Sequence, residues 1–231
     1  KTSSFNECYV KETLVLKKQI LILNSSLDTN GLNLTYFDEI YYNLYDALYN
    51  ETLISMEYLS SNLKFYLSKG QHFINNSSLN CFFKRVDSNI HIQPLNCSFY
   101  MEPKLCTKNE KSEVFLNGNI CFSINGVLIF ENIIIYGLKK LLDEELLNFF
   151  ELEILFDDPS LKYPNLTILN SGFVNIAVNY FMKMSKFGGI VDLRNLEFFN
   201  FLFTESFFYF NNNTFVLENA DVIIYSNQNY K

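Results

Sequence analysis

Two segments of the C-terminal third match residue by residue at an offset of 25 residues: Asn165–Asn175 recurs as Ile190–Asn200. In both copies, apolar residues lie two and four positions before an Asn, a Phe lies three positions after it, and a second Asn lies five positions after it. A fixed period in this range is the signature of solenoids and arrays, in which each repeat buries its apolar face against its neighbours. The sequence therefore constrains architecture more than activity.

The repeated unit has the pattern of short strands. Residues Leu166–Ile168 alternate apolar and polar side chains with period two, and no helical stripe runs through either copy. A third copy, Phe215–Val222, follows 24 residues after the second and aligns Asn219 with Asn195. We expect each repeat to form one coil of chain that stacks on the next about 4.8 Å away.

This stacking predicts a structural role for the repeated Asn residues. At a bend, Asn tolerates left-handed backbone, and its amide can pair with the amide of the Asn on the next coil. We therefore expect ladders rather than ligand sites, formed by Asn170, Asn195 and Asn219 at one corner and by Asn175 and Asn200 at another. Further upstream, Asn132 aligns either with Asn170, 38 residues on, or with Asn175, 43 residues on.

Two insertions interrupt the period, and both have helical spacing. Apolar residues from Phe37 to Leu48 follow the i, i+3, i+4, i+7 pattern of an amphipathic helix. Residues 138–151 repeat this stripe, with acidic residues on the opposite side. The spacing predicts helices over 36–49 and 138–151 that pack on the body of the molecule.

Charge and hydropathy narrow the possible partners. The net charge of −7 and pI near 4.9 argue against nucleic acid and anionic membranes, which require a basic patch. No apolar stretch reaches the 18 residues of a membrane span. Hydrophobic residues make up 48 %, enough for a single core over residues 1–231. Because the chain starts at Lys1 without Met, we expect a processed product or a piece of a longer or assembling chain.

Sequons for N-glycosylation are frequent. Their number is roughly twice what random placement of the Asn, Ser and Thr residues gives, which favours a secreted, extracellular or cell-surface protein carrying N-linked glycans. The eight sequons begin at Asn24, Asn33, Asn50, Asn75, Asn76, Asn96, Asn165 and Asn212.

The cysteines fit an oxidising compartment. Four of them fall within 41 residues and allow two disulfides in any of three connectivities, with Cys8 left over. The five are Cys8, Cys81, Cys97, Cys106 and Cys121. With no C-x-x-C motif, and with His72 and His91 as the only histidines, a Cys/His zinc site is not expected, and no cofactor is predicted.

A known group of proteins shares these features. Gly188-Gly189-Ile190, followed by Phe198-Phe199-Asn200, resembles in part the Gly-Gly-x-Ile and Phe-x-x-Asn repeats of large adhesive surface proteins. Over residues 72–228 the chain resembles the right-handed parallel β-helix, or pectin-lyase-like, superfamily. The resemblance implies a mainly β fold, a β-helix (solenoid) with two short helical insertions. It does not carry a function with it.

No catalytic constellation is recognisable in the sequence. Asp157-Asp158 is the only adjacent Asp pair, and its position before Pro159 fits a turn equally well. A lyase needs an Arg near an acidic cluster, and Arg85 and Arg194 are the only arginines. A polysaccharide lyase or hydrolase of the pectin-lyase-like fold therefore remains an alternative rather than the preferred interpretation.

We favour a secreted, N-glycosylated structural protein that forms or decorates an extracellular filament, appendage or surface layer. Neither end shows a charged, Pro-bearing cap, so we expect the chain to assemble with itself, head-to-tail or laterally. A carbohydrate-binding adhesin module is a further alternative. Its candidate exposed stripe is Phe207–Phe210, because four consecutive aromatics in a strand cannot all point inward.

Overall fold

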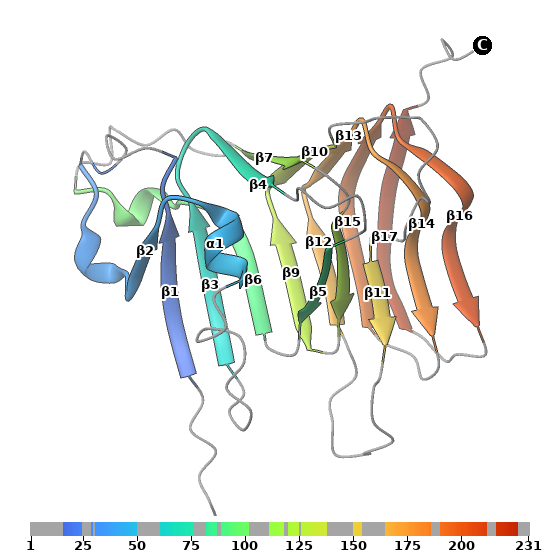
Figure 1. Cartoon of the computed structure of the whole chain (residues 1–231), viewed down its shortest axis with the longest axis horizontal. Coiled ribbons are helices and arrows are strands. Elements are labelled where there is room, and N and C mark those ends of the chain that lie inside the picture. The colour runs from blue at the N-terminus through green and yellow to red at the C-terminus, as the bar shows by residue number, and fades with distance from the viewer. Residues whose placement is uncertain are drawn as a thin grey trace, which may run out of the picture.

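The computed structural model shows parallel strands laid side by side by successive turns of the chain (Figure 1). Two sheets result, one of 12 strands and one of five. Within the described residues, no helix is long and apolar enough to cross a membrane. The structure describes residues 16–24, 29, 31–49, 61–75, 82–86, 89–101, 111–117, 120–124, 126–137, 150–153, 165–185, 190–211 and 216–225.

The larger sheet consists of two faces joined by one long strand, β15 (Ile190–Phe199). Its first half pairs with β12 and its second half with β13. The strands of the first face are β1 (Leu16–Ile22), β3 (Ser61–Leu67), β6 (Asn89–Pro94), β9 (Val127–Glu131) and β12 (Asn165–Leu169). The strands of the second face are β4 (Gln71–Asn75), β7 (Ser112–Asn117), β10 (Ile133–Gly137) and β13 (Gly172–Val174).

The five-stranded sheet is a third face, with the strand order β16-β14-β11-β8-β5. A last strand, β17 (Val216–Tyr225), pairs with β15 along both of its halves. Because the chain visits the faces in the same order on each turn, the topology is compatible with a parallel β-helix. The third-face strands are β5 (Phe82–Val86), β8 (Ile120–Ile124), β11 (Phe150–Glu153), β14 (Ala177–Ser185) and β16 (Leu202–Asn211).

The strand register reproduces the 25-residue repeat. Leu166 pairs with Val191, and Phe173 pairs with Phe198, their rings stacked 5.1 Å apart at 10°. The pairing of Glu131 with Leu169 also resolves the ambiguity upstream, because it aligns Asn132 with Asn170.

The predicted register of the third copy is wrong. Asn219 pairs with Asp192 rather than with Asn195, and Phe198 pairs with Ile224. The physical reason is a pair of register shifts between β15 and β17, one after Val191 and one between Leu193 and Leu196. Such irregularities insert residues that a fixed sequence offset cannot anticipate.

Alternate residues of each strand fill the interior in columns. In the first face, the column that runs from β3 to β15 is at most 1 % exposed at every position. Each such side chain contributes roughly 1.5–3 kcal/mol when it is removed from water. This column consists of Leu63, Ile90, Leu128, Leu166 and Val191.

Asn residues occupy the corners between faces. All the described non-glycine residues with positive φ are Asn, with φ between 49° and 56°. Asn195 Nδ2 donates to Asn170 Oδ1 at 3.0 Å, and Asn200 Nδ2 donates to Asn175 Oδ1 at 2.6 Å. The corner residues are Asn132, Asn170, Asn175, Asn195 and Asn200.

The first predicted helix is largely wrong. In place of a helix over 36–49, the chain forms a 3-10 turn, a strand β2 (Glu39–Tyr41) and a short helix α1 (Leu44–Tyr49). β2 gains backbone hydrogen bonds along β1 that outweigh its helical periodicity. The helix instead starts after Asn43, whose Oδ1 accepts from Tyr45 N at 2.8 Å.

The second predicted helix, 138–151, lies mostly outside the described residues, since its positions 138–149 are not described. Its last two residues belong to β11, where Phe150 pairs with Phe122 of β8 and with Met182 of β14. The prediction is therefore wrong from Phe150 onward, because parallel pairing with two neighbouring strands determines the backbone there.

The N-terminal end of the stack is covered. Ile20 and Ile22 of β1 are fully buried although β1 belongs to the first coil. Leu44, Ala47 and Leu48 of α1 belong to the same hydrophobic cluster, and β2 continues the sheet beyond β1. The expectation that neither end is capped is wrong at this end, because the residues read as a helical insertion form the cap.

Candidate functional site

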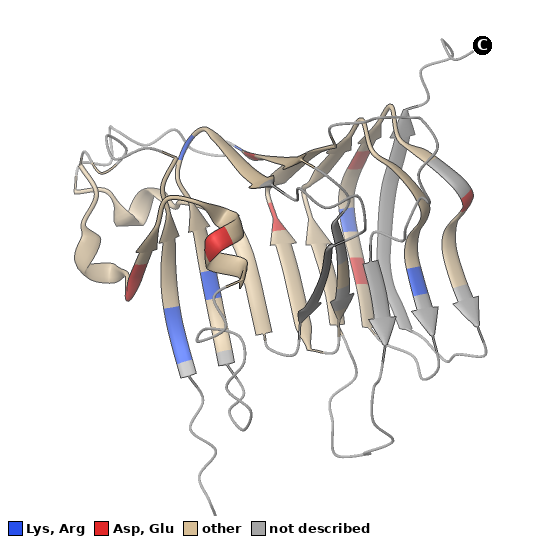
Figure 2. Cartoon of the chain, viewed as in Figure 1, with Lys and Arg blue, Asp and Glu red and all other residues tan. Residues whose placement is uncertain are grey.

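The largest described hollow lies over the outer side of β1, β3, β6 and β9, and we call it the basic groove. It has a volume of about 750 Å³. Of its described lining residues, Lys17, Lys18 and Lys64 are cationic at neutral pH, and Asp38 is the single carboxylate. Figure 2 shows the positive charge on β1 and β3. Cationic residues are thus concentrated on one face of a chain whose net charge is −7.

The strand register places the polar residues of the groove in rows. Lys64 pairs directly with His91, which pairs with Ile129. In the neighbouring row, Asn89 Nδ2 donates to Asn62 Oδ1. Amides and cations beside half-buried apolar side chains suit an anionic ligand that also has carbon surface, such as an acidic sugar.

His91 is an outward strand residue, as its alternation with isoleucines predicts. Its Nε2 lies 3.0 Å from Glu131 Oε2. Burial lowers the pKa of His91 below its ordinary value of 6.5 and the charge of Lys64 lowers it further, whereas Glu131 acts in the opposite direction. The imidazole is therefore neutral at pH 7, and it contacts Glu131 through a hydrogen bond rather than a full ion pair.

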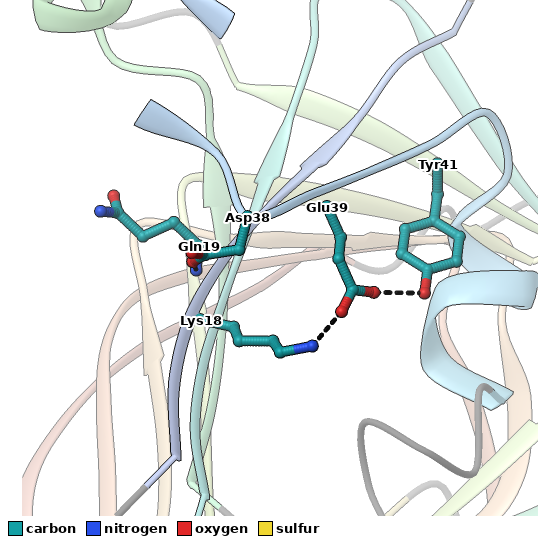
Figure 3. Close-up of polar contacts among 5 residues, drawn as sticks. All are labelled: Lys18, Gln19, Asp38, Glu39 and Tyr41. Carbon is teal, nitrogen blue, oxygen red and sulfur yellow. Dashed lines mark hydrogen bonds and ion pairs between the residues drawn. The ribbon is translucent and has the colours of Figure 1, made fainter. Parts of the chain in front are cut away.

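A second polar cluster lies where β2 meets β1 (Figure 3). Lys18 stands in register with Leu63, so it occupies the column that is apolar in the following coils. Its Nζ forms an ion pair with Glu39, which also accepts a hydrogen bond from the Tyr41 hydroxyl at 2.6 Å. Burial raises the pKa of Glu39, but the hydrogen bonds from Lys18 and Tyr41 outweigh it and hold the pKa below 4.5.

Two main-chain contacts fasten β2 beside this cluster. Asp38 Oδ2 accepts from Gln19 N at 2.7 Å, and Gln19 O accepts from Asp38 N at 2.8 Å. The cluster of Figure 3 thus neutralises a charge in the interior column and holds the edge strand in place. Both are structural tasks rather than catalytic ones.

An aromatic row lies on the outer side of the second face. Phe73 stacks on Phe115 at 5.3 Å, and Phe115 stacks on Tyr136 at 4.6 Å with an interplanar angle of 7°. Sugar recognition by aromatic residues uses free ring faces, and stacking uses these faces for contact between neighbouring strands. The row therefore stabilises strand pairing.

The predicted aromatic stripe, Phe207–Phe210, is only partly exposed. Phe207 stacks on the buried Phe181 at 4.7 Å, and Phe207 and Phe208 both pack against the core. Tyr209 is 37 % exposed and lies beside Tyr180, with ring centroids 5.1 Å apart. The side chain of Phe210 is outside the described residues.

The remaining catalytic candidates do not converge. Arg194 Nε donates to Asp192 at 2.7 Å, and Asp192 is 6 % exposed. Asp157 and Asp158 lie outside the described residues, as does the side chain of Arg85. Within the part of the chain that the structure describes, no three His, Cys, Asp or Glu residues group to hold a metal ion.

The sequons fall in different surroundings. Asn33 Oδ1 accepts from Thr35 N at 3.2 Å, and Asn96 Oδ1 accepts from Ser98 N at 3.1 Å, so each begins a short 3-10 turn. Asn24 is exposed just after β1, and Asn165 begins β12. The other four are described incompletely or not at all: the side chain of Asn75 and all of Asn50, Asn76 and Asn212.

Of the cysteines, only Cys97 has a described side chain, and it is disulfide-bonded. Its bonding partner is not among the described side chains. Cys121 lies in β8, and its side chain is not described. Cys8, Cys81 and Cys106 lie outside the described residues, so the connectivity stays open.

The basic groove was not foreseen from the sequence. Its cationic and amide residues come from strands that are 45, 27 and 38 residues apart along the chain, as the pairs Lys17 with Asn62, Asn62 with Asn89 and Asn89 with Val127 show. Only an alignment of upstream strands across these unequal insertions could have brought them together. Comparisons of the chain with protein-family models, curated proteins and solved structures give no match.

Proposed function

We propose that the chain is a right-handed parallel β-helix that serves as a secreted, N-glycosylated structural protein and decorates an extracellular surface, appendage or filament. One observation carries this proposal: polar side chains of neighbouring strands and corners are spent on one another. The pairs are Asn170 with Asn195, Asn175 with Asn200, Asn62 with Asn89, His91 with Glu131 and Lys18 with Glu39. Such pairing supports a rigid stack.

The covered N-terminal end modifies the expected mode of assembly. Head-to-tail growth at this end would require β2 and α1 to leave, and it would expose the Lys18–Glu39 ion pair to a partner's apolar column. We therefore place contacts between copies on the sides of the stack. Lateral contacts leave the buried cap intact.

Secretion, glycosylation and particle shape can be tested together. The chain should be expressed through a eukaryotic secretory pathway, its sequons mapped by mass spectrometry, and the purified protein imaged by negative-stain microscopy. We expect glycans on several sequons and laterally associated rods. A product without glycans would contradict the proposal of secretion, and monodisperse monomers at all concentrations would contradict self-assembly.

The basic groove supports a second candidate function, the binding of an acidic glycan on a surface. Lys17 and Lys64 supply positive charge, while Val127 and Ile129 supply apolar contact. A glycan array should therefore show acidic oligosaccharides, with affinity that falls as salt increases. Lys64→Glu should weaken binding at least tenfold, whereas Lys183→Glu, on another sheet, should not.

A polysaccharide-cleaving activity stays a prediction. Its candidate residues, Asp157 and Asp158, lie outside the described part of the chain. Comparing Asp157→Asn with the unaltered protein on acidic polysaccharides tests it directly. An activity that the substitution abolishes would favour the enzyme over the structural protein.

A further inference from the structure

A second, smaller cavity lies where the end of β1, the start of α1 and β4 meet. Its volume is about 280 Å³, just below the range of roughly 300–1,000 Å³ typical of pockets for drug-sized ligands. It is therefore of a size for a single sugar residue. Its wall includes Asn24, Tyr42, Asn43, Gln71, Phe73 and Asn117.

The cavity has an uncharged lining with aromatic rings. Tyr42 is 62 % exposed and Phe73 is 41 % exposed, although both are large apolar side chains. Among the described residues that line it, none is Lys, Arg, Asp or Glu, in contrast to the basic groove. Amide groups both donate and accept hydrogen bonds, and aromatic rings cover apolar surface. Together they match a neutral sugar, which has hydroxyl and acetamido groups on a carbon ring.

Asn24 connects this cavity to the sugar that would fill it. It is the first residue of the sequon Asn24-Ser25-Ser26, it is exposed, and it belongs to the cavity wall. A glycan attached to its Nδ2 therefore starts at the edge of the cavity.

The backbone holds Asn24 in this place. Asn24 N donates to Ser68 Oγ at 2.9 Å. Gly70, at φ +119°, leaves the space that the Asn24 carboxamide occupies, because a Cβ there would lie 2.5 Å from Nδ2. The orientation of the glycan attachment point is thus determined by the fold.

We propose that this cavity holds the first N-acetylglucosamine of a glycan on Asn24, which packs against Tyr42 and Phe73. The glycan thereby becomes part of the N-terminal cap: it covers aromatic surface next to α1 and ties the end of β1 to β4. This inference rests on the proposed secretion and glycosylation of the chain.

The test is a double-mutant cycle on protein secreted from a eukaryotic host, with Asn24→Gln, Tyr42→Ala and the double variant. We expect Asn24→Gln to lower Tm by about 2–4 °C in the Tyr42 background and by much less in the Tyr42→Ala background. Asn33→Gln is the matched control, because it removes a glycan from an exposed turn outside the cavity. Its effect should not depend on Tyr42.

A second readout does not depend on stability. We expect the Asn24 glycan of the native protein to be released more slowly by a peptide N-glycosidase than the Asn33 glycan. The substitution Tyr42→Ala should remove this protection at Asn24 and leave the rate at Asn33 unchanged.

The outcomes separate this inference from the proposed function. A glycan on Asn24 that is neither protected nor coupled to Tyr42 overturns the inference, and so does an empty Asn24 in a protein glycosylated elsewhere. Binding of free N-acetylglucosamine by Asn24→Gln, without coupling in the glycosylated protein, assigns the cavity to an external sugar and also overturns it. Only the absence of glycans from all sequons contradicts the proposed function itself.

Discussion

At the scale of single residues, the corner Asn side chains connect sequence and fold most directly. Their left-handed backbone costs most L-residues roughly 1–2 kcal/mol, and Asn reduces that cost through local hydrogen bonding. Asn170 and Asn195 could be predicted as a pair because they lie in an uninterrupted 25-residue repeat. Asn219 could not be placed, because the register shifts that separate it from Asn195 arise from the pairing of β15 with β17.

Asn195→Ala should destabilise the protein by about 1–2 kcal/mol, because Ala lacks the amide and resists the φ of 52°. The free energy of unfolding can be measured by urea denaturation. Asn195→Gly is the matched control: it accepts the left-handed backbone and loses only the hydrogen bond to Asn170, so its loss should be smaller. Equal losses in the two variants would show that backbone conformation contributes nothing at this corner.

At the scale of elements, the residues near the N-terminus show how a neighbouring strand overrides local periodicity. Phe37–Leu48 has the spacing of a helix, yet three of its residues pair with β1 as β2. The free edge of a parallel sheet offers hydrogen bonds that the isolated segment does not have, and this edge is invisible in the sequence. The same limitation hid the basic groove, whose rows form only when strands separated by unequal insertions are in register.

The attachment of β2 should depend on acid pH through Glu39. Its pKa is lower in the folded protein than in the unfolded chain, so its contribution is present above pH 4.5 and is lost as pH falls through the folded pKa. Because the pair is partly exposed, we expect Glu39→Gln to cost under about 1 kcal/mol at pH 7. Thermal unfolding measured from pH 7 to pH 3 should show this difference shrinking below pH 4.5.

Asp38→Asn provides the comparison for that measurement, since Asp38 also holds β2 but bonds a backbone N–H instead of a lysine. A difference between Glu39→Gln and the unaltered protein that grows as pH falls would contradict the assigned direction of the Glu39 pKa shift.

At the scale of the whole molecule, the stack has one closed end, and this closure limits how copies can meet. α1 closes it with small and branched apolar residues, among them Leu48, which is 3 % exposed. An uncovered parallel edge with an apolar interior pairs readily with another chain. The cap therefore serves both stability and solubility.

Leu48→Ala should destabilise the protein by about 2–5 kcal/mol and promote association between copies, because it leaves a cavity under the cap and loosens α1. Light scattering after size-exclusion chromatography measures the association, and thermal unfolding measures the stability. Leu34→Ala is the control, since Leu34 is 37 % exposed on the turn before β2. If Leu48→Ala lost stability but stayed strictly monomeric, the cap would not protect against association.

The closed end also affects the order in which the protein can fold. Each coil hydrogen-bonds only to the coils before and after it, so no coil needs residues from the far end of the chain. The cap and the first two coils are built from the first 75 or so residues, which leave the ribosome first. We expect that segment to serve as a template on which later coils are added one by one as the chain crosses a membrane during export. Export and folding would then advance together, and no long unpaired strand edge would wait for its partner.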